Sequence, residues 1–230
     1  MVRHSFAIGL VLGLTCASST VFAADSGLAL GARVGYAIPM GKLGGTTAAN
    51  ASNHDLADNV SGMVPLWFDV GYRINPAIYL GGFFQYGFGS FNKDKNPACS
   101  QGLSCSAHDI AFGANLHYHI LPDATFDPWL GAGLGYEILT ENISGTAFGQ
   151  NADGSSTFKG LQFLLLEAGG DFRATPDLAI GPFLNFALGQ YSTWSNEGTA
   201  AGISLNQSGD VTDSGTHEWL TLGIRGQYNL

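Results

Sequence analysis

The sequence predicts an all-β protein: an eight-stranded antiparallel transmembrane β-barrel with short periplasmic turns and long extracellular loops. Three observations lead to this fold class. Apolar residues recur at every second position in eight separate segments, which is the period of a β-strand. The connections between these segments alternate between short and long. The positions between the apolar residues hold glycines and scattered charges but no lysine, which is unusual for a surface in water.

The composition narrows the class of protein further. The chain has 230 residues, 33 of them glycine, and charged residues make up only 12% of it. Average proteins have about 25% charged residues. The formal net charge of −9 excludes the basic surface that nucleic-acid binding requires. The length alone allows one domain or two.

Residues 1–23 have the pattern of a signal peptide. Arg3 provides a basic start, an apolar run follows over residues 6–14, and the residues up to Ala23 fit the small-x-small rule for cleavage. The apolar run is too short to span a bilayer, which takes about 20 helical residues. We therefore expect an exported protein whose single mature domain, residues 24–230, is the barrel.

Export also decides how the cysteines are interpreted. Cys16 lies in the signal peptide, and a lipoprotein anchor there is a less favoured alternative, because the preceding residues match that pattern poorly. Cys99 and Cys105 remain in the mature chain, six positions apart. An oxidising compartment favours a disulfide between them. Two free thiols, or a metal site that includes the nearby His108, are the alternatives.

The eight apolar segments follow one another along the mature chain. Their lengths suit tilted strands that cross a bilayer, which takes about 9–11 residues each. In the sixth segment the apolar phase changes near Phe163, which predicts a β-bulge. The segments are residues 28–38, 64–74, 78–88, 110–120, 130–138, 161–172, 178–188 and 220–230.

The connections between the segments predict which end of the barrel faces the cell exterior. Short turns are expected at residues 75–76, 121–127 and 175–177, and long polar loops at residues 39–60, 90–107, 140–158 and 192–214. An even number of strands places both termini at the end with the short turns. Because the signal peptide delivers the N-terminus to the periplasm, the long loops are expected to face outward.

The last segment raises the question of which face of each strand is outside. Leu222 and Ile224 lie on the apolar face, and Arg225 lies between them on the other. The second face is rich in glycine throughout the chain, which suits the inside of a narrow barrel. Aromatic residues near both ends of the apolar rows suit the two interfaces of a bilayer. A secreted soluble barrel or sandwich, with the apolar rows as its core, is the alternative.

The charged residues of the inward face predict a network of ion pairs that plugs the lumen, because a buried charge needs a partner. The spacing from the short turns places two arginines and two aspartates in one layer, with two glutamates higher in the barrel. A charged constriction in an ion pathway is the alternative. The predicted network comprises Arg33, Asp69, Arg73, Glu137, Glu167, Asp171 and Arg225.

The whole mature chain resembles the small outer-membrane β-barrel superfamily, which includes the OmpA, OmpX and OmpW types. The resemblance rests on the first strand "LALGARVGYAIP", on "FLNFALGQYS" and on the terminal "LTLGIRGQYNL". The final strand is similar to the assembly signal of that group, with Tyr228 before the end, but it closes on Leu230 where phenylalanine is commoner. The resemblance implies an integral protein of the outer membrane of a Gram-negative bacterium, inserted by the barrel assembly machinery.

Members of this superfamily act as structural proteins, adhesins, small porin-like channels or lipid A enzymes, and the fold does not choose among them. Lipid A deacylases of similar size use a histidine followed two residues later by serine, and none of the six histidines here has that neighbour. We therefore expect a non-enzymatic protein with a structural or surface-interaction role through its extracellular loops. A small channel for ions or solutes is the main alternative, ahead of a lipid-modifying enzyme.

The sequence contains no strong cofactor or metal motif. His117 and His119 share the inward face, where hydrogen bonds to interior carboxylates are expected more often than a metal pair. Residues 151–156 and 209–215 only faintly resemble calcium loops. No cofactor and no nucleic acid are therefore expected. The expected partners are outer-membrane lipids, lipopolysaccharide and the assembly machinery, with the protein itself a monomer.

Overall fold

The computed structural model describes residues 26–44, 54–96, 99, 103–147, 150–200, 203–212 and 214–230. The expected signal peptide, residues 1–23, lies outside these ranges and stays a prediction. Within the described ranges, no helix has both the length and the apolar character needed to cross a membrane.

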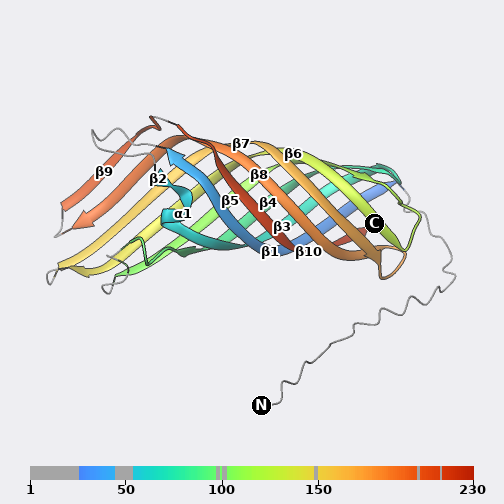
Figure 1. The fold of residues 1–230 in the computed structure, drawn as a ribbon, viewed down its shortest axis with the longest axis horizontal. Coiled ribbons are helices and arrows are strands. Elements are labelled where there is room, and N and C mark those ends of the chain that lie inside the picture. Colours follow the sequence, from blue (N-terminus) through green and yellow to red (C-terminus); the bar gives the residue numbers. More distant parts are fainter. Residues whose placement is uncertain are drawn as a thin grey trace, which may run out of the picture.

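Eight long strands of the described chain close into an antiparallel barrel (Figure 1). Each pairs with the next along the chain, and the last closes the ring by pairing with the first, so the predicted fold class is the one observed. The barrel strands are β1 (Gly27–Gly44), β3 (Val60–Asn75), β4 (Ile78–Phe91), β5 (Ser104–His119), β6 (Phe126–Ala147), β7 (Gln150–Arg173), β8 (Leu178–Ala200) and β10 (His217–Asn229). Three shorter elements lie outside the ring: β2 (His54–Asp55), α1 (Leu56–Asn59) and β9 (Ile203–Asp210).

The closing pair β1–β10 sets the position of the chain end. Arg33 lies directly opposite Arg225 in this pair, and the Leu230 amide donates to the Leu28 carbonyl at 2.8 Å. The beginning of β1 and the C-terminus therefore lie at the same end of the barrel, together with the short turns (Figure 1). A ring without an open edge satisfies the backbone hydrogen bonds that lipid cannot satisfy.

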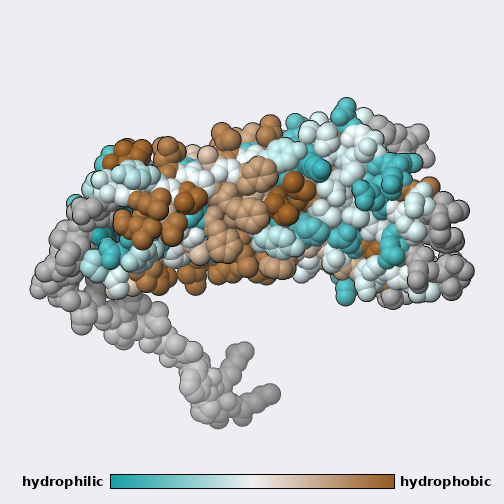
Figure 2. Space-filling view, turned by 180° about the vertical axis from the view of Figure 1, so that it is seen from behind, coloured by the Kyte–Doolittle hydropathy of each residue, from teal (hydrophilic) through white to brown (hydrophobic). Residues whose placement is uncertain are grey.

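The apolar rows face outward. Leu222 is 65% exposed and Ile224 beside it is also exposed, whereas Arg33 is only 4% exposed and Arg225 is likewise buried. Exposed leucine, valine, isoleucine and aromatic side chains form a broad belt around the barrel, visible in brown in Figure 2. An exposed belt of this size is stable only against lipid, so the inward direction predicted for Arg225 is correct.

The β-bulge predicted near Phe163 is present. The pairing of β7 with β8 shifts register between Gln162 and Leu164, so one extra residue is inserted at this point. Phe163 and Leu166 are both exposed, although three positions separate them, and Leu165 is buried in the lumen. The bulge thus explains the apolar residues that break the alternation of this strand.

Two of the predicted long loops are wrong. Residues 140–158 and 192–214 are largely strand, because β6, β7 and β8 continue beyond the apolar belt and β9 pairs with β8. We call this part, residues 140–147, 150–159, 193–200 and 203–210, the polar extension. It projects from the end of the barrel opposite the C-terminus (Figure 1). Its strands escaped prediction because polar residues and glycine occupy most positions on both faces, so they carry no apolar alternation.

The predicted disulfide between Cys99 and Cys105 is formed. It joins Cys99, in the connection between β4 and β5, to the second residue of β5, at the same end as the polar extension. The bond closes a short loop outside the apolar belt.

Replacing Leu222 by arginine is expected to destabilise the barrel, whereas the same change at Leu205 is not. Both side chains are equally exposed, at 65% and 64%, but Leu222 lies in the apolar belt and Leu205 in the polar extension. Arginine on the lipid face costs about 2–4 kcal/mol at the bilayer midplane and about 0–1 kcal/mol near the interfaces. Urea-induced unfolding in lipid vesicles measures the difference. Equal losses in the two variants would contradict a lipid environment around the belt.

Candidate functional site

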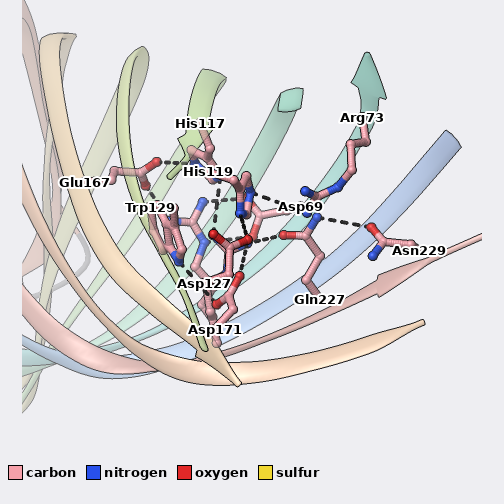
Figure 3. Close-up of polar contacts among 12 residues, drawn as sticks. Asp69, Arg73, His117, His119, Asp127, Trp129, Glu167, Asp171, Gln227 and Asn229 are labelled. Atoms are coloured by element: carbon pink, nitrogen blue, oxygen red, sulfur yellow. Dashed lines mark hydrogen bonds and ion pairs between the residues drawn. The ribbon is translucent and has the colours of Figure 1, made fainter. Parts of the chain in front are cut away.

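The lumen holds two clusters of buried polar side chains. The lower network lies nearer the short turns and centres on Arg33, Glu167 and Arg225. The upper cluster lies nearer the polar extension and centres on Glu137. Figure 3 shows the lower network, whose side chains come from strands on all sides of the barrel and point toward one another.

Arg33 connects three strands in the lower network. Its guanidinium donates from Nε to Asp69 Oδ2 at 2.7 Å, and from Nη1 to Glu167. The charge lies 5.6 Å from the ring centre of Trp67 and 5.7 Å from that of Phe183. Two carboxylates and two aromatic faces thus compensate an arginine that has almost no contact with water.

His117 extends the network from Glu167 to Arg225. Arg225 Nη1 lies 3.3 Å from His117 Nδ1, and His117 Nε2 lies 2.6 Å from Glu167 Oε2. Because an arginine nitrogen can only donate, Nδ1 accepts and Nε2 carries the proton that it donates to Glu167.

Arg225 ends the network on Asp171. Its Nη2 lies 3.2 Å from Asp171 Oδ2, and its guanidinium lies 4.1 Å from the ring centre of Trp129. The Trp129 indole donates to the other Asp171 oxygen at 3.2 Å. An unbroken chain of charged and polar contacts therefore crosses the lumen from Asp69 to Asp171.

Arg73 lies apart from the other predicted residues. Its Nη1 donates to the Pro76 carbonyl at 2.8 Å, and its Nη2 lies 3.4 Å from His119 Nε2. His119 in turn contacts Asp127 at 2.7 Å. In the described chain, Arg73 reaches a carboxylate only through this histidine, because it lies at the end of β3 beside the turn.

Glu137 forms the upper cluster without an arginine. It is fully buried, at 0% exposure, and its two carboxylate oxygens accept four hydrogen bonds. The donors are Tyr191 at 2.6 Å, Gln162 at 2.7 Å, Trp219 at 2.9 Å and His217 at 2.9 Å. Glu137 is therefore higher in the barrel, as expected. Glu167 is not, because it reaches down to Arg33.

Several residues of the two clusters were missed by sequence reasoning. Trp129 and Trp219 lie one residue before the predicted segments 130–138 and 220–230, and extending the inward row of each segment by one residue would have found them. Tyr191 and His217 lie just beyond the predicted strand ends, and no signal marked them. Asp127 was assigned to a turn, whereas it is the second residue of β6.

Little space remains in the lumen between the clusters. A cavity of about 10 Å³ is bordered by Trp67 and Glu167 of the lower network and by Gln162 and Trp219 of the upper cluster. This is room for about one water molecule. No group of three or more potential metal ligands of the His, Cys, Asp and Glu types occurs among the described residues.

Glu141 is a third buried carboxylate, on β6 beyond the apolar belt. Its outward neighbours Thr140 and Asn142 are polar, whereas Ile138 is the last apolar residue of the outward row. The side chain is 7% exposed, and Asn59 of α1 donates to its Oε2 at 3.0 Å. Burial raises the pKa of Glu141 from 4.5 to about 7, against the smaller lowering effect of this hydrogen bond.

Replacing Arg33 by methionine is expected to destabilise the folded barrel by about 3–5 kcal/mol, because it leaves buried carboxylates without their cation. The matched control is Lys42→Met, which removes the same charge from the half-exposed pair of Lys42 with Asp55. An exposed pair contributes about 0–1 kcal/mol. Urea-induced unfolding in vesicles compares the two. A smaller loss for the Arg33 variant than for the control would refute the role of the lower network.

Glu141→Gln is expected to change how stability depends on pH. Because the pKa of Glu141 is raised in the folded state, the folded protein binds more protons than the unfolded one between about pH 4.5 and 7. The free energy of unfolding therefore falls as the pH rises through this window. The variant should lose this component and be relatively more stable at the upper end, whereas the neighbouring Thr140→Ala should keep it. Unfolding midpoints across the window test this, and parallel profiles for Glu141→Gln and the native protein would disprove it.

Comparison with known proteins gives the fold its context. The chain matches no protein-family model and shows no significant match to a curated protein. It is similar in structure to a major outer membrane protein from Thermus thermophilus, with 14% identity, a TM-score of 0.56, and coverage of 89% of this chain and 99% of that one. It is also similar to the outer membrane protein OprG from Pseudomonas aeruginosa, with 11% identity, a TM-score of 0.53, and coverage of 92% and 100%.

Identities this low establish the fold and not the activity. The likeness nevertheless spans nearly the whole chain, and the apolar belt independently requires a lipid environment. The fold of this chain is therefore that of the small outer-membrane β-barrels, and its apolar belt makes it an integral membrane protein.

Proposed function

We propose that this protein is a non-enzymatic outer-membrane barrel that acts at the cell surface through its polar extension. In this function the barrel serves as a rigid anchor. Lipids and lipopolysaccharide surround its apolar belt, and the assembly machinery recognises its terminal strand, β10. The protein works as a monomer, because its ring of strands is complete without a second copy.

The observation that supports this proposal most strongly is the filling of the lumen. The lower network and the upper cluster lie one above the other, and the cavity that touches both is only about 10 Å³. The contacts of Arg33, Glu167 and Arg225 hold strands on opposite sides of the barrel together. An eight-stranded barrel filled in this way is suited to rigidity and poorly suited to conduction.

The polar extension supports the surface role. It raises a four-stranded sheet beyond the apolar belt, with regular pairing up to Ala147 and Gln150 in one hairpin and up to Ala200 and Ile203 in the other. A sheet built on a rigid barrel holds its side chains in fixed positions. Such positioning is a requirement of recognition and is not needed for anchoring alone.

In planar lipid bilayers the protein is expected to show no sustained ion conductance, because both clusters block the lumen. The double variant Arg33→Ala with Trp219→Ala removes one large side chain from each cluster and should produce measurable openings. It is the positive control, because it shows that the assay detects a barrel with an open lumen. Steady, ion-selective openings of the unaltered protein would overturn the proposal and favour a small channel.

A further inference from the structure

The inner face of the polar extension contains a hollow that the plugged lumen does not use. It has a volume of about 360 Å³, within the usual range of about 300–1,000 Å³ for small-molecule sites. It continues the lumen-facing rows of the barrel strands above the upper cluster. The hollow is bordered by residues that include Glu141, Ile143, Ser156, Asn196, Leu205 and Gln207.

Two rows of residues that run across the four strands create this hollow. In the first row, Glu141 lies opposite Ser156, Ser156 opposite Asn196, and Asn196 opposite Gln207. Residues directly opposite in antiparallel strands share one face of the sheet. Four polar side chains from β6, β7, β8 and β9 thus stand side by side over the hollow.

The second row has an apolar residue at each end and two glycines between them. Ile143 lies opposite Gly154, Gly154 opposite Gly198, and Gly198 opposite Leu205. A Cβ atom added at Gly154 would approach no other heavy atom closer than 4.0 Å, and one added at Gly198 would approach none closer than 3.5 Å. Neither packing nor backbone conformation requires glycine at these positions. Because Gly154 and Gly198 have no side chains, the space between the apolar side chains of Ile143 and Leu205 is open.

Glu141 places a partly unsatisfied carboxyl group beside the hollow. Its Oε2 accepts the hydrogen bond from Asn59, but its Oε1 is buried and has no hydrogen-bond partner among the described residues. A buried acceptor without a donor is costly, and more so for a charged group. Because Glu141 borders the hollow, a donor bound there lies next to this carboxylate, and a small rotation of the side chain would let Oε1 accept the missing hydrogen bond.

The residues that border the hollow favour a ligand with a positively charged hydrogen-bond donor. Glu141 is the carboxylate on this face, because Glu197 lies opposite Ser155 and shares the other face of the sheet with Asn142. No lysine, arginine or histidine is among the described residues that border the hollow. Lys159 borders a different depression, together with Asp210. An ammonium group has three donors and no acceptor, which matches carboxylate, amide and hydroxyl oxygens. The apolar ends at Ile143 and Leu205 suit an aliphatic stem.

We propose that this hollow binds a primary ammonium group on a short aliphatic stem. Glu141 accepts a hydrogen bond from the ammonium, Asn196 and Gln207 offer further amide oxygens, and the stem lies over Gly154 and Gly198. Both a free diamine and a lysine side chain of a peptide carry this group. The inference deepens the proposed surface role and rests on the polar extension being accessible from outside the cell.

Isothermal titration of the full chain in lipid nanodiscs tests this inference. The probes are cadaverine, as the free diamine, and a capped Gly-Lys-Gly peptide, with pentanol as the neutral control. A pH of about 8 keeps Glu141 ionised, because it is above the pKa of about 7. At least one cationic probe should bind, and pentanol should not. The stronger probe identifies the source of the ammonium group.

Two variants locate the site. Glu141→Gln should weaken binding by about tenfold or more, because a hydrogen bond between charged groups is lost. Gly154→Leu should abolish binding by filling the hollow without a backbone clash. Asp210→Asn is the matched control, since it removes a carboxylate of the same extension outside the hollow. It should change the affinity by about twofold at most.

Heat-modifiable migration on a gel verifies that each variant folds, and Gly154→Leu keeps the test valid if Glu141→Gln does not fold. Equal binding of pentanol, or unchanged affinity in the folded variants, would overturn the inference. If neither cationic probe binds and the barrel does not conduct, the binding inference is wrong and the proposed function is unaffected. If the unaltered protein conducts ions, the proposed function is wrong, whereas the measured binding of the probes remains valid.

Discussion

The closure of β10 onto β1 is the constraint on which the rest of this structure depends. Backbone groups in the hydrocarbon core have no water to bond with, so the sheet can have no open edge there. Closing it with eight strands leaves a lumen that is only as wide as its own side chains. The interior must therefore be filled. The glycines and the large inward residues, such as Trp129 and Tyr191, share this narrow space between them.

The charges in the lumen are acceptable because they compensate one another across the barrel. Arg33 contacts Asp69 on the adjacent strand and Glu167 on a distant one, and His117 connects Glu167 to Arg225. A buried ion network contributes less to stability than its many contacts imply, because desolvation opposes it. Its main effect is to specify one arrangement of strands, since any shift in register separates partners that belong together.

The alternation of apolar residues was sufficient to predict the fold, the barrel strands, the inward faces and the bulge near Phe163, because lipid outside and packing inside impose opposite demands on each strand. The heights of side chains were harder to predict. Barrel shear and side-chain length bring Glu167 down to Arg33, and neither is visible in one strand alone. The polar extension and the hollow beside Glu141 were missed, because strands with polar residues and glycine on both faces lose the apolar period of two that identifies a strand.

The strands of the barrel end at different heights, so the part of the sheet that extends furthest has two faces with different surroundings. The strands of the polar extension continue past the membrane, while β10 begins only at His217 and β3 begins directly after α1. The sheet raised in this way keeps the curvature of the barrel. Asn142 lies on the outward row of β6, on the back of the sheet, whereas Glu141 lies on the inward row, on the front that faces the barrel axis. Molecules that diffuse within the membrane plane therefore meet the back of this sheet, and solutes that arrive along the barrel axis meet its front.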